Sequence, residues 1–399
     1  MTRNTARAIA GAVALGGALL CLPAGVSISP AQAAATITNR AVGVPLQEAQ
    51  QLAGQRNWTA AIAKAREARG ADGITPAETN LIDQLIGSYM LQARDYRGAL
   101  AHYEGLAARG VNRQVSLQAA LMSALQLNNL AKAQELANQM PGGAGNAEIY
   151  IAQGMSRAGN HREAIRRATP LAQRNPPSQD ALEVLEASYN ALNDAAGRRN
   201  ALEQLVLHYP TAARWSNLIR LTRNQRGLTD AQQLDLFRIR ALVGDLKTAE
   251  DYSEMAQMAL IVGYPADAKA ILDAGVEEDL LTGERSERLI ALTNERLAAD
   301  GPVAAALVSQ AAADASGNTD IRLGLSMLSY GRAADAEAAI QRGIAKGGVT
   351  DADGARVALG RALLAQDKRQ EAVRAFNAVP RTSPQAPIAR LWSLYAQRG

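Results

Sequence analysis

An alanine with similar apolar neighbours recurs along this sequence at intervals near 34 residues. Successive intervals are 38, 34, 31, 104, 68 and 36, and the two long ones are close to three and two times 34. A repeat of this length is a single supersecondary unit, which must stack on copies of itself to bury its apolar face. The recurring alanines are Ala61, Ala99, Ala133, Ala164, Ala268, Ala336 and Ala372.

One unit can be followed in residues 152–176. Small or apolar residues lie three apart in its first half, and Gly159 interrupts the series. A second series, Ala164, Ala168 and Leu171, has the i, i+4, i+7 spacing of one helix face. The pattern predicts two short helices joined by a turn, repeated along the chain.

This period and pattern resemble the tetratricopeptide repeat (TPR). In that family a small residue, a larger apolar residue three positions later and an alanine twelve positions after the first mark the helix contacts. Matching residues here are Gly87, Met90, Ala99 and Tyr103 in one copy, Gly360, Leu363, Ala372 and Phe376 in another, and Ala256, Ala259, Ala268 and Leu272 in a third. One unit departs from the pattern, with Arg198 at the alanine position. The resemblance covers roughly residues 46–384.

The composition agrees with an all-helical chain. Aromatic residues make up 4% of the sequence, alanine is abundant, and alternating runs rich in Val, Ile and Thr are absent. We therefore expect an all-α fold. The resemblance implies a right-handed α-solenoid of about ten TPR-like helix pairs, with a helix from Pro387 as a C-terminal cap.

The first 33 residues have the layout of a secretory signal peptide. Arg3 and Arg7 precede an apolar run, and residues 31–33 form an Ala-Gln-Ala cleavage site. An uncleaved membrane anchor is the rival interpretation, and Cys21 raises that of a lipoprotein. Glycines in the apolar run argue against an anchor, and Leu20 before the cysteine argues against lipidation. Cleavage after Ala33 removes the only cysteine, and we expect a periplasmic protein with no membrane span in the mature chain.

The remaining chain divides into stretches by how closely each follows the repeat. Predicted boundaries are a linker at 34–45, an N-terminal TPR array at 46–210, a degenerate helical region at 211–315, and C-terminal TPR pairs with the capping helix at 316–399. Within the degenerate region, Gly301-Pro302 predicts a break between two helices.

Charge is balanced in sum and uneven in distribution. Without Arg3 and Arg7 the chain has 40 basic and 38 acidic residues, which does not favour nucleic-acid binding. Residues 157–240 hold thirteen arginines and eight acids, whereas residues 241–315 hold five basic residues and fourteen acids. This asymmetry either steers a charged partner or reflects the solvated outer faces of repeat helices.

Motifs for catalysis or cofactor binding are lacking. The three histidines, His102, His161 and His208, do not have metal-ligand spacing, and no glycine-rich phosphate loop follows a strand. We therefore expect no cofactor, no metal and no enzymatic activity. The alternative is a hydrolase or transferase with its site in the atypical region 211–315, which requires buried, convergent polar groups there. A glycan-binding solenoid is a third possibility, but few aromatic residues are available for it.

The family resemblance points instead to the concave face formed by the first helix of each pair. Carried over position by position, it gives Gln84, Gln118, Gln153, Arg157, Arg220 and Arg223 as candidate partner-binding residues. Amide groups can pair with a peptide backbone, and guanidinium groups can bind carboxylates. We expect a non-enzymatic scaffold or adaptor of the bacterial cell envelope that binds a peptide or helix of another envelope protein or complex.

Overall fold

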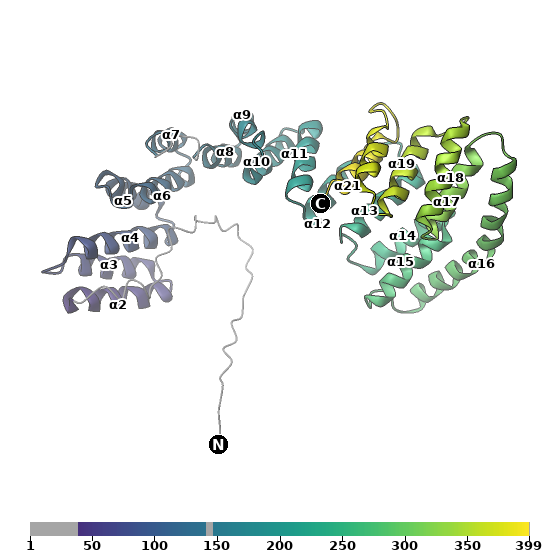
Figure 1. Cartoon of the computed structure of the whole chain (residues 1–399). Helices are drawn as coiled ribbons and strands as arrows, with labels where there is room; N and C mark the ends of the chain where they lie inside the picture. Colours follow the sequence, from purple (N-terminus) through teal and green to yellow (C-terminus); the bar gives the residue numbers. More distant parts are fainter. Residues whose placement is uncertain (1–38, 141–146, 399) are drawn as a thin grey trace, which may run out of the picture. The chain divides into compact units, whose positions relative to one another are not determined.

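The computed structural model describes residues 39–140 and 147–398, so the predicted signal peptide lies outside the described residues. The described residues form 20 helices and no strand (Figure 1). Among residues 40–157 and again among residues 161–396, successive helices pack on one another. The predicted all-α solenoid of TPR-like helix pairs is confirmed.

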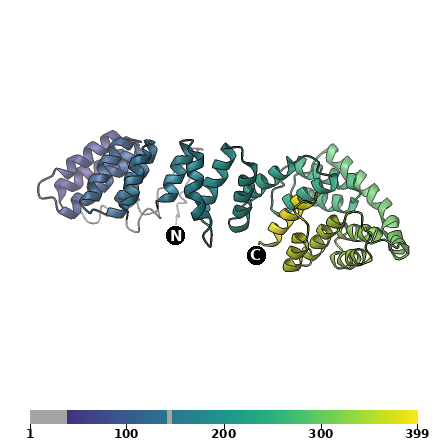
Figure 2. The ribbon, with the colours of Figure 1, turned by 90° about the horizontal axis from the view of Figure 1, so that it is seen from above.

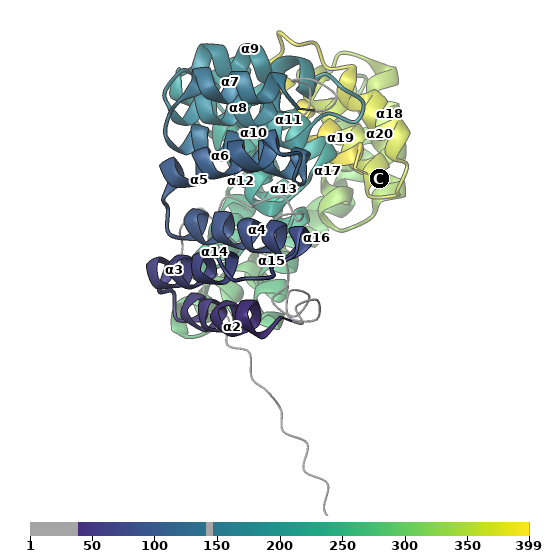
Figure 3. The same ribbon diagram turned by 90° about the vertical axis from the view of Figure 1, so that its left-hand side faces the viewer.

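The chain divides between Ala158 and Gly159 into two compact units, here called the N-terminal and C-terminal units. Figure 3 shows α2, α3 and α4 of the N-terminal unit stacked in order. The helices of the N-terminal unit are α2 (Arg40–Gly54), α3 (Trp58–Arg69), α4 (Pro76–Gln92), α5 (Tyr96–Ala108), α6 (Arg113–Gln126), α7 (Leu130–Asn138) and α8 (Glu148–Arg157).

The C-terminal unit is the larger and contains thirteen of the described helices. They are α9 (His161–Ala172), α10 (Gln179–Ala191), α11 (Ala195–His208), α12 (Ala212–Arg223), α13 (Asp230–Leu242), α14 (Ala249–Val262), α15 (Pro265–Glu277), α16 (Glu284–Ala313), α17 (Asn318–Ser329), α18 (Ala333–Lys346), α19 (Ala352–Leu364), α20 (Arg369–Asn377) and α21 (Ala386–Ala396). The predicted boundaries at 210 and 315 stay predictions, because contacts divide the chain only at Gly159.

The small residues of the repeat lie where helices approach most closely. All seven recurring alanines have no exposed surface. Gly87 in α4 faces the ring of Tyr103 in α5, and a Cβ atom at Gly87 would lie 2.6 Å from Cζ of that ring. Helix pairs therefore interlock by placing a bulky side chain of the second helix over a small residue of the first.

The first helix begins earlier than the sequence pattern indicates. The predicted linker extends to residue 45, but α2 begins at Arg40 because Asn39 caps it, accepting a hydrogen bond from the backbone N–H of Ala41 at 3.0 Å. Pro45 lies inside this helix and is buried beside Leu46. Burial of this apolar face outweighs the hydrogen bond that proline cannot donate.

The predicted break at Gly301-Pro302 is wrong. Helix α16 runs without interruption through Pro302 for 30 residues. Its two ends are held by different clusters: Leu289 packs beside α14 and α15, whereas Leu307 packs with Leu323 and Ala339. Packing at both ends keeps the helix continuous despite the poor helix formers Gly301 and Pro302 at its centre.

The last helix returns to the middle of the C-terminal unit. Besides α19 and α20, α21 contacts α11, α12 and α13 (Figures 1 and 2). Trp392 stacks on Phe376 with 6.2 Å between ring centroids, and Tyr395 meets Trp215 of α12 edge-on at 6.3 Å. The predicted capping helix thus covers the last pair and also closes the C-terminal unit on itself.

Within the described ranges, no helix combines the length and apolar character that crossing a membrane requires.

Candidate binding pockets

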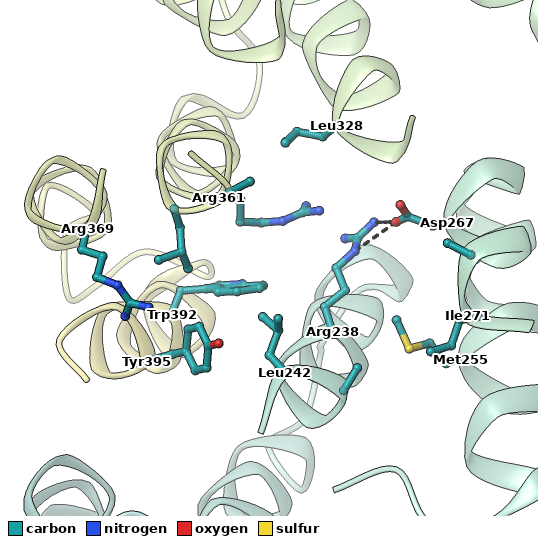
Figure 4. Close-up of a pocket in the computed structure, with 14 residues that line it drawn as sticks. Arg238, Leu242, Met255, Asp267, Ile271, Leu328, Arg361, Arg369, Trp392 and Tyr395 are labelled. Atoms are coloured by element: carbon teal, nitrogen blue, oxygen red, sulfur yellow. Dashed lines mark hydrogen bonds and ion pairs between the residues drawn. The ribbon is translucent and has the colours of Figure 1, made fainter. Parts of the chain in front are cut away.

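The C-terminal unit contains a hollow of about 440 Å³ that is open to solvent, here called the inner pocket. Its wall comes from α13, α14, α15, α17, α19, α20 and α21 (Figure 4). Most of the lining is apolar, including Leu242, Met255, Leu328 and Trp392. Leu242 lines this space and is 51% exposed, so the pocket has an apolar surface that no described side chain covers.

A cluster of paired charges borders the inner pocket. Arg238 Nη1 donates to Asp235 at 2.7 Å, and Arg238 Nε donates to Asp267 at 3.1 Å. Burial opposes the charge on Arg238, but the two carboxylates outweigh it and raise the pKa of this group. Arg238 also lies over the ring of Tyr264, whose own pKa burial raises. Both carboxylates are therefore engaged by Arg238, which directs three of its five N–H donors to them.

Arg361 has far fewer partners than Arg238. Its side chain is 12% exposed, and its one ion pair within the described residues is with Asp235 at 3.3 Å. The guanidinium also lies over the ring of Trp392, 5.9 Å from the centroid. Burial, followed by the nearby charge of Arg238, lowers the pKa of Arg361. Most of the five N–H donors of Arg361 thus have no acceptor among the described residues.

A second hollow, the side pocket, lies between α12, α13 and α14 and has a volume of about 300 Å³. Two of the predicted partner-binding residues, Arg220 and Arg223, line it together. Its apolar lining is Ile219, Leu236 and Phe237, and the other lining residues are polar or charged. A mainly polar surface of this kind is typical of the rim of a protein–protein interface.

The arginines and carboxylates of the side pocket are only partly paired with one another. Arg240 pairs with Asp245 at 3.1 Å and with Asp251 at 2.6 Å. Arg220 donates to Asn217 at 2.9 Å, a neutral group. Arg223 has no polar side-chain partner among the residues described, and its side chain is exposed. With the exposed Glu254 included, the lining holds three arginines and three carboxylates, and Arg220 and Arg223 are the two arginines that have no described carboxylate partner.

The other four predicted residues lie in the N-terminal unit. Gln84 in α4 is half-buried and accepts a hydrogen bond from Asn112 at 2.9 Å. Gln118 in α6 and Gln153 in α8 are also half-buried, and Arg157 is exposed at the end of α8. A common groove for all six residues stays a prediction, and only Arg220 and Arg223 line one described hollow.

The enzyme alternative requires buried, convergent polar groups in residues 211–315, and Asp235, Arg238 and Asp267 form such a cluster. However, Arg238 occupies both carboxylates, and neither is left as a base. Across residues 39–140 and 147–398, no three His, Cys, Asp or Glu side chains gather to hold a metal ion. This cluster and Arg361 were missed in the sequence, because single charges between apolar positions resemble a solvated helix face.

No protein-family model matches the chain, and no curated protein matches it. Solved structures do match. A tetratricopeptide repeat protein from Parabacteroides merdae is 12% identical, covers 64% of this chain and 99% of its own, and has a TM-score of 0.37. Naa15/Naa10 bound to HypK-THB is 13% identical, with 87% and 53% coverage and a TM-score of 0.41. Yeast Tom70 is 9% identical, with 89% and 94% coverage and a TM-score of 0.25.

The assignment of the fold therefore stands on the chain's own features: consecutive helix packing, buried alanines at the repeat positions, and a small residue facing a bulky one within a pair. With these features, the chain is a TPR-like helical repeat protein.

Proposed function

We propose that this protein is a non-enzymatic scaffold that binds an acidic segment of another cell-envelope protein at the side pocket. The observation that carries the proposal is the unpaired guanidinium of Arg223 at the side pocket. Arg220 adds a second cation whose described partner is neutral. A carboxylate of a partner can form charge-assisted hydrogen bonds with both groups, while an apolar residue of the partner covers the half-buried Phe237.

The position of the unpaired cations, rather than the sum of charges, favours this choice of partner. Asp245 and Asp251 share Arg240, which neutralises one of their two charges. Glu254 is the one carboxylate of the lining without a described ion pair. Arg220 and Arg223 lie three residues apart on α12 without a described carboxylate partner, and such a pair of cations favours an acidic segment at that edge.

The test is chemical crosslinking and capture from cell envelopes, comparing wild type with an Arg220→Glu/Arg223→Glu variant. We expect one partner to be lost in the variant, with the crosslinked segment of that partner rich in Asp and Glu. Arg226→Glu is the matched control, since Arg226 is exposed in the loop that follows α12 and does not line the pocket. Retention of the partner by the double variant, or equal loss with Arg226→Glu, contradicts the proposal.

Export to the periplasm is part of the same proposal and is supported by the signal-like segment at residues 1–33. Cleavage at the Ala-Gln-Ala site predicts a mature chain beginning at Ala34. N-terminal sequencing of the protein recovered from the periplasmic fraction checks this. A chain that still begins at residue 1, or that fractionates with the cytoplasm, contradicts it.

A further inference from the structure

Arg361 has few described hydrogen-bond acceptors in the inner pocket. Its side chain is 12% exposed, and its one described ion pair is with Asp235, which also receives a shorter bond from Arg238. The guanidinium nitrogens are not buried without a partner, so water in the pocket reaches them. A ligand that displaces this water must supply acceptors for the N–H groups.

The surroundings of Arg361 define what kind of acceptor fits. In Figure 4 its guanidinium extends from α19 toward the middle of the pocket, while Arg238 turns away toward Asp267. The planar, forked donors of arginine match the two oxygens of a carboxylate. Asp267 presents no free charge to repel such a group, because Arg238 holds it.

The rest of the pocket is suited to an apolar body attached to that carboxylate. In Figure 4, Leu328 lies above Arg361, and Trp392 and Leu242 lie below it. A volume of about 440 Å³ falls in the range of pockets that hold small organic ligands. Burial of the ligand's apolar part would cover the half-exposed Leu242.

We propose that the inner pocket binds a small organic carboxylate with an apolar body, with Arg361 holding the carboxylate. The site is separate from the side pocket, and the proposal does not depend on the scaffold function. The carboxylate supplies acceptors for the N–H groups of Arg361 that have none among the described residues, and the apolar body packs between Leu242, Leu328 and Trp392.

The test is calorimetric titration of the full chain with octanoate, and with octan-1-ol as the uncharged probe of equal chain length. Wild type is expected to bind octanoate more tightly than octanol. Arg361→Met keeps the size and apolar character of the side chain, and we expect it to weaken octanoate about 10- to 100-fold, the range for a hydrogen bond to a charged group. Octanol binding should not change.

Two further variants locate the effect. Arg356→Met removes an arginine of the same helix that pairs with Asp353 and does not line the pocket, so octanoate binding should match wild type. Leu242→Trp fills the space from a half-exposed position and is expected to weaken both probes without lowering the melting temperature. This variant tests the site even where Arg361→Met alters stability.

Two results overturn the proposal. One is the absence of octanoate binding to folded wild type; the other is equal octanoate affinity in wild type and folded Arg361→Met. A third arm uses a short peptide ending in leucine, as free acid and as amide. Suppose that wild type binds the free-acid peptide but neither the amide nor octanoate, and that Arg361→Met does not bind the free acid. The ligand is then the C-terminal carboxylate of a polypeptide and not a small organic carboxylate. Partner capture at the side pocket should be unaffected by Arg361→Met, which separates the two proposals.

Discussion

Arg390, in the last helix, donates a hydrogen bond from Nε to Oε2 of Glu203 at 2.8 Å, and Glu203 lies 187 positions earlier in the chain. A second hydrogen bond between distant parts of the chain runs from Gln232 Nε2 to the carbonyl oxygen of Pro384, at 2.8 Å and over 152 positions. An open solenoid has contacts only between neighbouring repeats. These two bonds, with the aromatic contacts of α21, make the C-terminal unit a closed one.

The Arg390–Glu203 pair should contribute measurably to stability. Its side chains are 44% and 12% exposed, so solvent screens the pair only in part. We expect a coupling free energy of about 1 kcal/mol from urea unfolding of Arg390→Met, Glu203→Gln and the double variant. The exposed pair Arg374–Glu371 is the control, with coupling close to zero. Strict additivity for Arg390 and Glu203 argues that closure rests on the aromatic contacts alone.

Alanine substitution should have opposite effects at two helical glycines of the N-terminal unit. Gly87→Ala forces Tyr103 to shift and should lower the free energy of unfolding by about 1–3 kcal/mol, the usual cost of overpacking. Gly105 in α5 has no atom within 4 Å of a Cβ at that site, and alanine there should add about 0.5–1 kcal/mol. Denaturant unfolding measures both. Equal effects of the two substitutions contradict the interlocking of α4 with α5.

Removing the Asp235 carboxylate from its cluster with Arg238, Arg361 and Asp267 should lower the free energy of unfolding. Asp235→Asn leaves Arg361 without its described ion pair and Arg238 with Asp267 alone. We expect a loss of about 3 kcal/mol in the free energy of unfolding, because a buried charge is left unpaired. Asp273→Asn breaks an exposed pair with Lys269 within α15 and should cost less than about 0.5 kcal/mol. A small effect at Asp235 means that water reaches the cluster.

Asp314, between α16 and α17, should titrate in an unusually acidic range. The hydroxyl of Thr319 first, and then Ser316, donate to this carboxylate and lower its pKa from 3.8 to about 2. Because the folded pKa is depressed, this stabilisation is present above about pH 3.8 and is lost as the pH falls through about 2.

Carbon NMR of the side-chain carboxyl measures this titration directly. In Thr319→Val we expect the pKa of Asp314 to move toward 3.8. Glu163 serves as the internal control in the same spectra, because Arg166 and then Arg167 hold its pKa near 2 independently of Thr319. A pKa of Asp314 that stays near 2 in the variant assigns the shift to the backbone N–H and hydroxyl of Ser316 instead.

The sequence predicted those parts of the structure that repeat. The recurring alanines all lie at helix contacts because close approach of two helices permits only a small side chain there, and this requirement recurs in each pair. Arg220 and Arg223 came from the family resemblance, as two of six concave-face residues; both line the side pocket, and the partner-binding role of all six stays a prediction.

Features that depend on contacts outside the repeat could not be predicted in this way. Pro302 is a strong local signal for a break, but tertiary packing at both ends of α16 overrides it. Arg361 appears in the sequence as an ordinary polar position beside Gly360. Only the return of α21 to the middle of the unit buries it, and no local pattern encodes a partner more than a hundred residues away.

The closing helix also bears on how the protein is made. Gln232 leaves the ribosome 152 residues before its partner at Pro384, which at about 5–20 residues per second is a wait of roughly 8 to 30 seconds. Throughout that interval the surface of α12 around Trp215 lacks its cover. A chain that ends before Ala386 lacks that cover permanently, so a premature stop near the C-terminus exposes a surface in the middle of the protein.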